Sequence, residues 1–363
     1  MTALMAELRH SPPLWLLVFV PAVFLGHAIR PEAHTLLFVL SVLAIVPLAA
    51  LLSRATESVA ARTGDTVGGL LNASLGNLTE LVIALAALRA GQYMLVKASL
   101  VGAIVANTLC MLGASFLLGG LTHHVQEFNR INARLQASLL FLAIVALLAP
   151  SVVKVIDAPH AEFAQELSLG LSGLLISAYV LGLMFSLRTH REFFAAAEHA
   201  SDGDAPWPVA VALTALAVAT VLVALVSEVF VDSVQQAAVS FGMTPAFVGF
   251  IVVAQVGGAA EMFSALSGAR KNRLDLSVGI ALGSATQIAL LVGPVLVLLS
   301  YVIGPTPMDL RFWPGAIAMM LIATLTAALV TSSGKSAWFV GVLLLMVYLT
   351  FAMTLYLLPP ETV

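Results

Sequence analysis

Residues 69–88 read GLLNASLGNLTELVIALAAL, an apolar stretch with a single acidic side chain, Glu80, near its middle. A helix needs about 20 mostly apolar residues to cross the hydrocarbon core of a bilayer. A charged side chain at that depth costs about 2.5–3.5 kcal/mol on insertion scales, so such residues usually mark a path for ions or protons. The stretch therefore predicts a membrane-spanning segment with a functional carboxylate.

A second stretch follows the same plan. Residues 249–268 read GFIVVAQVGGAAEMFSALSG and contain Glu261 as their one acidic residue. One constant offset in residue number joins several pairs of less common residues: Glu80 with Glu261, Arg89 with Arg270, and Gly102 with Gly283. Many transporters are built from inverted repeats that stay visible as weak internal similarity. The matched pairs predict such a repeat in this chain.

The rest of the chain is equally apolar. Its 363 residues are 60% hydrophobic and 10% charged, whereas soluble domains carry about 25% charged residues. About eleven apolar segments have the length of a membrane helix: 13–29, 35–53, 66–88, 94–119, 134–152, 165–187, 208–230, 245–268, 275–301, 313–331 and 336–358. They are too long for the alternating strands of an outer-membrane barrel. We therefore expect an all-α polytopic membrane protein without strands.

The expected organisation is two inverted five-helix repeats with an extra N-terminal helix. The boundaries are 1–33 for the extra helix, which we expect to be retained rather than cleaved, 34–187 for the first repeat, 188–207 for an acidic cytoplasmic linker, and 208–363 for the second repeat. Lysine and arginine divide 11 against 5 between the two sides, which predicts an inner-membrane protein with a cytoplasmic N-terminus. The linker is read as a solvated connector, with a regulatory cation site as the alternative.

Oxygen-bearing side chains and glycines gather around the two glutamates. Gly76 and Gly257 precede them and can break the helix, which frees backbone carbonyls to coordinate a cation. Amide and hydroxyl groups lie close to the glutamates or in the next span: Asn77, Asn107, Gln255, Ser284 and Gln287. Such hard oxygen ligands suit Ca²⁺, Na⁺ or Mn²⁺ better than Zn²⁺ or Cu⁺. The single cysteine, Cys110, is expected to be a buried apolar residue.

Two buried carboxylates without a basic partner have to be neutralised by protons or by a cation. Burial and mutual repulsion favour protonated carboxyl groups, and a divalent cation reverses that preference. Competition of the two ions for the same oxygens is the thermodynamic basis of antiport. We expect no cofactor besides the transported Ca²⁺ and H⁺. The expected partners are these ions and the lipid bilayer, with a homo-oligomer left open; the net charge of −3 offers no basic face for nucleic acid.

Two long motifs carry a resemblance to a known family. GGLLNASLGNLTE at 68–80, continued to residue 120, and KNRLDLSVGIALGSATQIALLVGPVLVLL at 271–299 resemble the cation/proton exchanger (CAX) family of the Ca²⁺/cation antiporter superfamily. The resemblance implies Ca²⁺/H⁺ exchange by alternating access, gated by a sliding helix pair at 35–53 and 208–230. It also implies an ion site with these members: Asn77 and Glu80 from the first half, Glu261 from the second, and Asn107, Ser284 and Gln287 as supporting groups.

The second motif departs from the family pattern. The family usually has GNAAEH where residues 257–262 read GGAAEM, so Gly258 and Met262 replace an amide and an imidazole. Gln255 is a candidate to restore the amide oxygen. The transported cation therefore stays open, with Na⁺/H⁺, K⁺/H⁺ or Mn²⁺/H⁺ exchange as alternatives. One carboxylate in each half favours a carrier over a channel, and neither HExxH nor GxSxG is present, so no enzyme is expected.

Overall fold

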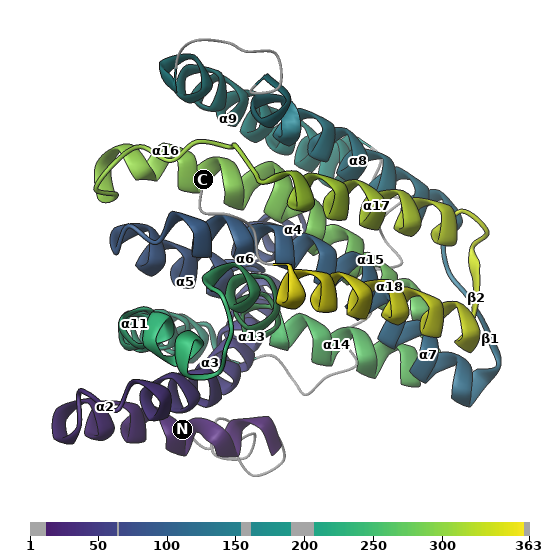
Figure 1. Cartoon of the computed structure of the whole chain (residues 1–363). Helices are drawn as coiled ribbons and strands as arrows, with labels where there is room; N and C mark the ends of the chain where they lie inside the picture. The colour runs from purple at the N-terminus through teal and green to yellow at the C-terminus, as the bar shows by residue number, and fades with distance from the viewer. Residues whose placement is uncertain (1–11, 64, 154–160, 190–206, 359–363) are drawn as a thin grey trace.

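The computed structural model describes residues 12–63, 65–153, 161–189 and 207–358, and the fold within these ranges is built almost wholly from helices (Figure 1). The first half of the chain contains the following helical segments and one described strand: η1 (Pro12–Val18), α2 (Phe19–Ile29), α3 (His34–Arg62), α4 (Asp65–Leu75), α5 (Leu78–Arg89), α6 (Tyr93–Val105), η2 (Ala106–Met111), α7 (Leu112–His123), β1 (Val125–Glu127), α8 (Arg130–Val153), α9 (Ala161–Met184) and η4 (Phe185–Thr189). The acidic linker lies at 188–207, so that expectation falls mainly outside the described residues.

The second half contains a matching series of elements: α11 (Val209–Ser240), α12 (Pro245–Phe247), η6 (Val248–Val253), α13 (Ala254–Gly257), α14 (Ala259–Arg270), α15 (Leu274–Gln287), η7 (Ile288–Val292), α16 (Gly293–Ile303), α17 (Pro314–Thr331), β2 (Lys335–Ala337) and α18 (Trp338–Leu357). Here η2, η6 and η7 are π-helical segments inside longer helices. Pro245 and Pro314 start their helices at positions where a missing N–H costs nothing.

Helix ends in the two halves agree with the constant offset seen in the sequence. The residue before α5 is Asn77 and the residue before α14 is Gly258, and both helices end at the matched arginines, Arg89 and Arg270. The helices that follow begin at Tyr93 and Leu274, which are again related by the same offset. The similarity of the halves therefore extends from sequence to secondary structure, while the inverted relation of two five-helix units stays a prediction.

Eight described helices are long and apolar enough to cross a membrane, and a ninth span results if α12 to α14 count as one bent segment. A shorter apolar helix, Leu14–Ile29, lies at the start of the described chain. The prediction of an all-α polytopic membrane protein is thus confirmed. The count of eleven spans stays a prediction, because the broken and short helices do not meet a simple length test.

The expectation of a fold without strands is wrong in one detail. β1 and β2 pair antiparallel, with Val125 opposite Ala337 and Glu127 opposite Lys335. They lie together at one end of the molecule, the right-hand end in Figure 1. Three residues each carry too little periodicity to be recognised in a sequence this apolar. The pair ties the connector between α7 and α8 to the connector between α17 and α18.

The predicted gating pair is present as two long helices that lie side by side. α3 and α11 are 29 and 32 residues long, longer than the spans of 35–53 and 208–230 that the sequence suggested. Phe38 and Phe230 stack between them with ring centroids 5.4 Å apart. Elsewhere backbones approach closely through glycine: a Cβ on Gly249 would lie 2.8 Å from the Leu95 carbonyl oxygen. Such contacts are typical of membrane helices that pack through small residues.

Candidate ion-binding site

Two helix breaks place the glutamates at the centre of the bundle. α4 gives way to α5 at Gly76 and Asn77, and α13 gives way to α14 at Gly258 with a 60° bend. Glu80 and Glu261 therefore lie in the first turns of α5 and α14. Helix N-termini carry partial positive charge, which stabilises a carboxylate nearby. The breaks also leave carbonyl oxygens at the ends of α4 and α13 without helical partners, as in other transporters with interrupted helices.

The two halves meet at Glu80 and Gly257. A Cβ built on Gly257 would lie 2.8 Å from Cγ of Glu80, closer than real Cβ atoms approach. Glycine at this position is what allows α13 to lie against the Glu80 side chain. A Cβ on Gly258 would be 3.5 Å from Oε1 of Glu80 and 3.8 Å from Oδ1 of Asn107. Gly258 is also the residue before α14, which carries Glu261 in its first turn, so the two glutamates approach one another at this helix break.

Three carboxylate oxygens in this site accept no hydrogen bond from the part of the chain that the structure describes. Both side-chain oxygens of Glu80 and Oε2 of Glu261 are buried and accept no hydrogen bond from another described residue. Buried polar groups are normally satisfied, and each exception calls for an explanation. A buried carboxylate is costly unless it binds a proton or a cation. These oxygens are therefore suited to hold exchangeable ions.

A chain of amides and a hydroxyl connects the remaining predicted residues. Asn77 Nδ2 donates to Gln287 Oε1 at 2.7 Å, and Ser284 Oγ donates to Asn77 Oδ1 at 2.6 Å. Asn107 Nδ2 in turn donates to Ser284 Oγ at 2.9 Å. Asn77, Asn107 and Ser284 are buried. The network fixes the orientation of the amides next to the glutamates, and it joins the start of α5 to η2 and α15.

All eight residues that the sequence singled out lie in this one region. Gly76 belongs to it through Gln287, whose Oε1 would lie 3.6 Å from a Cβ on Gly76. Gln255, proposed as a substitute amide, instead donates to the Tyr348 hydroxyl at 2.9 Å and so is engaged elsewhere. The described residues contain no group of three or more His, Cys, Asp or Glu side chains arranged for a metal. The donor set is thus two carboxylates with amide, hydroxyl and carbonyl oxygens, which matches hard cations.

Sequence reasoning missed a third carboxylate near the site. Glu57 on α3 acts electrostatically on Glu261, and it also lies 3.8 Å from the Arg54 guanidinium. In the sequence Glu57 follows Arg54 at the end of an apolar segment, and no repeat or motif links it to Glu80 or Glu261. Because α3 is one of the two long helices expected to move, this carboxylate lies on the side of the site where movement is expected.

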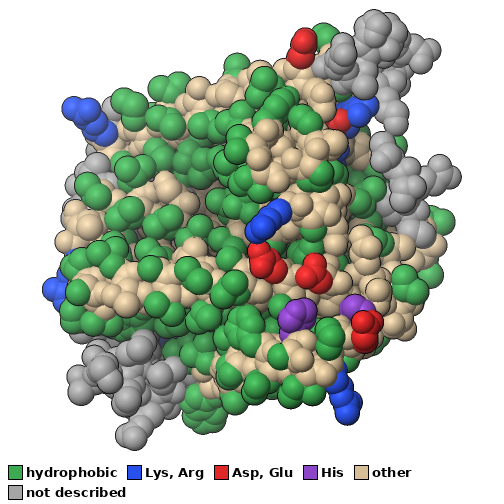
Figure 2. All heavy atoms as spheres, turned by 90° about the vertical axis from the view of Figure 1, so that its left-hand side faces the viewer, with side chains coloured by type: hydrophobic (Ala, Val, Ile, Leu, Met, Phe, Trp, Pro, Cys, Tyr) green, Lys and Arg blue, Asp and Glu red, His purple; other side chains and the backbone are tan. Residues whose placement is uncertain are grey.

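A small, mostly apolar cavity lies beside Glu80. Water can occupy about 10 Å³ of it, and apart from Glu80 and Ser99 its lining residues are apolar. The face opposite the strand pair combines hydrophobic side chains with a group of acidic, basic and histidine side chains below its centre (Figure 2). One of its ion pairs joins Arg89 to Glu228 at 3.0 Å. An apolar cavity offers no ligands to replace the water of a hydrated ion, so this cavity is a barrier to such an ion.

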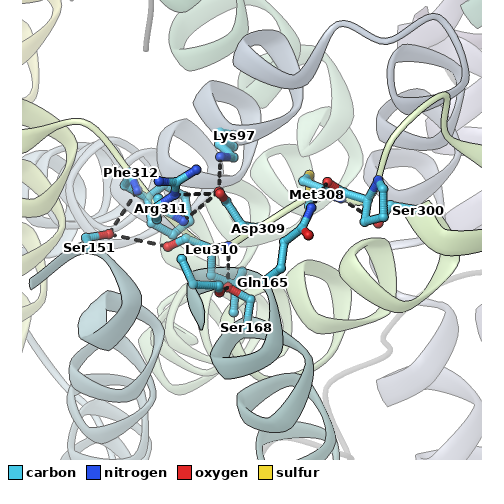
Figure 3. A network of polar contacts seen from close by, with 12 residues as sticks. Lys97, Ser151, Gln165, Ser168, Ser300, Met308, Asp309, Leu310, Arg311 and Phe312 are labelled. Atoms are coloured by element: carbon cyan, nitrogen blue, oxygen red, sulfur yellow. Dashed lines mark hydrogen bonds and ion pairs between the residues drawn. The ribbon is translucent and has the colours of Figure 1, made fainter. Parts of the chain in front are cut away.

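A dense polar network anchors the loop between α16 and α17 at the same end (Figure 3). Asp309 accepts from Lys97 Nζ at 2.5 Å and from Arg311 Nε at 2.6 Å. Burial alone would raise the pKa of Asp309, but the charge of Lys97 and the hydrogen bonds from Lys97 and Arg311 hold it below its ordinary value. Ser151 and Ser168 bind backbone groups of the same loop. The loop is therefore held firmly to α6, α8 and α9.

Comparison with known proteins agrees with this architecture. The model of the sodium/calcium exchanger protein family matches residues 33–188 and 211–357. The chain belongs to the sodium/calcium exchanger family. Within this family it is 39% identical over 359 residues to a Ca²⁺/H⁺ antiporter of Aphanothece halophytica, covering 95% of this chain and 96% of that protein. It is 40% identical over 326 residues to the Ca²⁺/H⁺ antiporter ChaA of Bacillus subtilis, covering 89% and 92%.

A solved relative of the exchanger family has the same fold. The structure of native YfkE superposes with a TM-score of 0.82 at 36% identity, and the match covers 94% of this chain and 98% of that one. The long interrupted helices around the two glutamates thus belong to a known transporter architecture. This chain is a multi-pass membrane protein of that family, and its relatives are named as antiporters.

Proposed function

We propose that this protein exchanges Ca²⁺ for H⁺ across the inner membrane by alternating access, with Glu80 and Glu261 as the residues that bind both ions. The observation that carries the proposal is the set of buried carboxylate oxygens without partners among the described residues, contributed by both halves at one site. The names of the relatives, Ca²⁺/H⁺ antiporters at about 40% identity, support the choice of ions.

The chemistry follows from charge compensation. When Ca²⁺ is bound, the carboxylates are ionised, and the N-termini of α5 and α14 add positive potential that favours this state. When Ca²⁺ leaves, two negative groups in an apolar surround cannot remain close together, so protons take its place. Asn77, Asn107 and Ser284 contribute neutral oxygens toward the six to eight that Ca²⁺ prefers. The site thus returns loaded with one kind of ion or the other.

Alternating access is proposed to come from sliding of α3 and α11 past the site. Both helices are long and lie against each other through apolar contacts such as Phe38 with Phe230. Toward the fixed helices, α11 is held by the exposed Arg89–Glu228 pair and by the hydrogen bond from Gln92 Nε2 to the Val231 carbonyl, and these two contacts have to open when the pair slides. The glutamates, in contrast, belong to helices joined by the amide network and by close glycine contacts. This division supports a mobile pair against a fixed site. The 11 against 5 distribution of lysine and arginine supports a cytoplasmic N-terminus, with the strand end facing the cytoplasm. The oligomeric state stays a prediction.

Everted membrane vesicles test the proposal. A proton gradient is established and followed with a pH-sensitive dye, and Ca²⁺, Na⁺, K⁺ or Mn²⁺ is added in parallel samples. We expect Ca²⁺ to dissipate the gradient in vesicles with the wild-type protein and not in vesicles with Glu261→Gln. The Na⁺, K⁺ and Mn²⁺ samples address the alternative that Gly258 and Met262 raise, since these residues replace an amide and an imidazole. Dissipation by Na⁺ with no response to Ca²⁺ would refute the assignment.

A further inference from the structure

A polar cavity lies between α8 and α15 on the side of the molecule where the strands pair. The space in it that water can occupy is about 10 Å³, room for roughly one water molecule. Its lining consists of Phe128, Asn129, Asn132, Ala133, Gln136, Asp275, Val278 and Gly279. Asp275 is the one titratable side chain among these residues. Three amides and a carboxylate provide the two to four polar partners that a buried water molecule needs. The cavity is therefore suited to hold water, in contrast to the apolar cavity next to Glu80.

The polar groups of this cavity form an ordered row. Asp275 accepts a hydrogen bond from the backbone N–H of Asn129, whose own side chain caps the start of α8. One turn into α8, Asn132 Oδ1 accepts from Gln136 Nε2 at 3.1 Å. Gln136 Oε1 is buried and has no hydrogen-bond partner among the described residues. A buried amide oxygen without a partner among the described residues is a place where a hydrogen-bond donor such as water can bind.

The row continues along α15 to the ion site. Asp275, Gly279, Gly283 and Gln287 follow at intervals of four residues, so each lies next to the one before it and the set turns about 120° around the helix. From first to last they span about 18 Å at 1.5 Å per residue. A Cβ on Gly283 would lie 3.8 Å from Gln136 Oε1, which places that amide next to the helix one turn before Gln287. Gln287 in turn accepts the hydrogen bond from Asn77.

The matched place in the other half has a different character. By the offset that relates the two halves, Val278 of this cavity corresponds to Lys97 on α6, where the ion pair with Asp309 fills the space. At one end of the molecule this position is occupied by the Lys97–Asp309 ion pair. At the other end the matched position, Val278, lines a cavity with three amide side chains. The asymmetry indicates that the row serves one side of the membrane only.

We infer that the row from Asp275 through Asn132 and Gln136 to Gln287 is a hydrated proton route to the two glutamates, separate from the Ca²⁺ path beside α3 and α11. This inference rests on the proposed exchange function. A proton passes from hydronium at Asp275 along hydrogen-bonded water, and it forms an O–H bond with a carboxylate oxygen of Glu80 or Glu261 while hydronium becomes water. The reverse transfer releases it.

The composition of the row explains why Ca²⁺ does not use it. Ca²⁺ requires six to eight oxygen ligands and charge compensation, whereas this row offers one carboxylate and neutral amides. A proton moves by exchange of hydrogen bonds and needs no such cage. Separate paths let a proton reach the carboxylates while the cation departs on the other side of α5.

The test compares two transport modes in vesicles with the full-length protein. Ca²⁺/H⁺ exchange requires proton movement, whereas exchange of radioactive Ca²⁺ for unlabelled Ca²⁺ requires none. Gln136→Met and Asn132→Leu keep side-chain volume but remove the amides. For each we expect the initial rate of Ca²⁺/H⁺ exchange to fall at least fivefold and Ca²⁺/Ca²⁺ exchange to stay within twofold of wild type. Gln136→Glu, which keeps a polar group at the same place, should preserve both modes.

Gln165→Leu is the matched control, because this glutamine lies on α9 at the other end and binds the Pro307 carbonyl. It should leave both modes unchanged. The inference is overturned if both substitutions in the row leave Ca²⁺/H⁺ exchange intact, or if both modes fall together. Failure of the exchange function itself has a different signature, because wild-type vesicles would then show no Ca²⁺-dependent loss of the proton gradient.

Discussion

Asn77 Nδ2 donates a 2.7 Å hydrogen bond to Gln287 Oε1, although the two residues are 210 positions apart in the chain. Asn77 occupies the break before α5, and Gln287 ends α15. The bond therefore links the helix that carries Glu80 to a helix of the opposite half. The two halves of the chain are therefore joined directly next to Glu80.

Replacement of either buried glutamate by glutamine should abolish exchange. Glu80→Gln or Glu261→Gln keeps the shape but removes the negative charge that holds Ca²⁺ and the group that carries a proton. We expect the Ca²⁺-dependent loss of a proton gradient to fall at least 100-fold, with normal insertion in the membrane. Glu32→Gln, at a side chain that is 95% exposed, should transport like wild type. Retained exchange in either buried variant would exclude the two-carboxylate site.

Ser284→Ala should weaken Ca²⁺ binding rather than stop transport. The hydroxyl accepts from Asn107 and donates to Asn77, so its loss leaves two buried amide groups short of a partner. One hydrogen bond contributes about 0.5–1.5 kcal/mol, so we expect the apparent KM for Ca²⁺ to rise about tenfold. Thr286→Val is the control, since Thr286 binds the Leu282 carbonyl of its own helix. Equal KM values for the two variants would mean that the network has no part in cation binding.

The adjacent glycines of the second motif should differ in their tolerance of a methyl group. A Cβ on Gly257 would be 2.8 Å from Glu80 Cγ, whereas the nearest atom to a Cβ on Gly258 is 3.4 Å away. The backbone at Gly258, with φ of −83°, accepts an L residue. We expect Gly257→Ala to reduce the exchange rate at least tenfold and Gly258→Ala to reduce it less than threefold. The opposite order would show that Glu80 does not lie against α13 during transport.

Asp309→Asn should destabilise the protein, and the effect should depend on pH. The substitution leaves Lys97 with a largely buried, uncompensated charge, which costs roughly 3 kcal/mol. Burial alone would raise the pKa of Asp309, but Lys97 and Arg311 hold it below its ordinary 3.8 in the folded protein. The contribution of Asp309 is therefore complete above pH 3.8 and is lost as pH falls through the lower, folded value.

Thermal unfolding of purified protein in detergent measures this difference. The gap in Tm between wild type and Asp309→Asn should be wide at neutral pH and should narrow below pH 3.8. The double variant with Lys97→Met should recover part of the loss, because it leaves no lone buried charge at position 97. Glu127→Gln breaks the exposed pair with Lys335 and should change Tm very little. A pH-independent gap would show that packing, not the ion pair, sets the effect.

Much of this site was predictable because its chemistry conflicts with its surroundings. A lone glutamate in an apolar span is conspicuous, and a constant offset between matched residues links Glu80 to Glu261 in the sequence alone. Gly76 and Gly257 signalled the helix breaks through their low helix propensity. Asn107, Ser284 and Gln287 stood out as polar residues in apolar spans, and the CAX resemblance implied a supporting role for them; all three lie in the network.

Other features had no signal in the sequence. The contact of Gly257 with Glu80 depends on how two distant helices cross, and the position of Glu57 beside the site depends on the rotation of α3. Gln255 had the right chemistry, but the side of the helix on which it lies directs it to Tyr348. The strands were too short to show a period of two. Long-range packing decides each of these, and hydrophobic periodicity says little where every face is apolar.

The pairing of β1 with β2 has a mechanical consequence. It clips the α7–α8 connector to the α17–α18 connector, so four helices from the two halves share one rigid edge. We expect these four helices to move as one unit. Ion exchange at the glutamates then does not rotate one half of the chain against the other. We therefore expect the proposed movement to be confined to α3 and α11, which lie outside the part of the fold that the strands join.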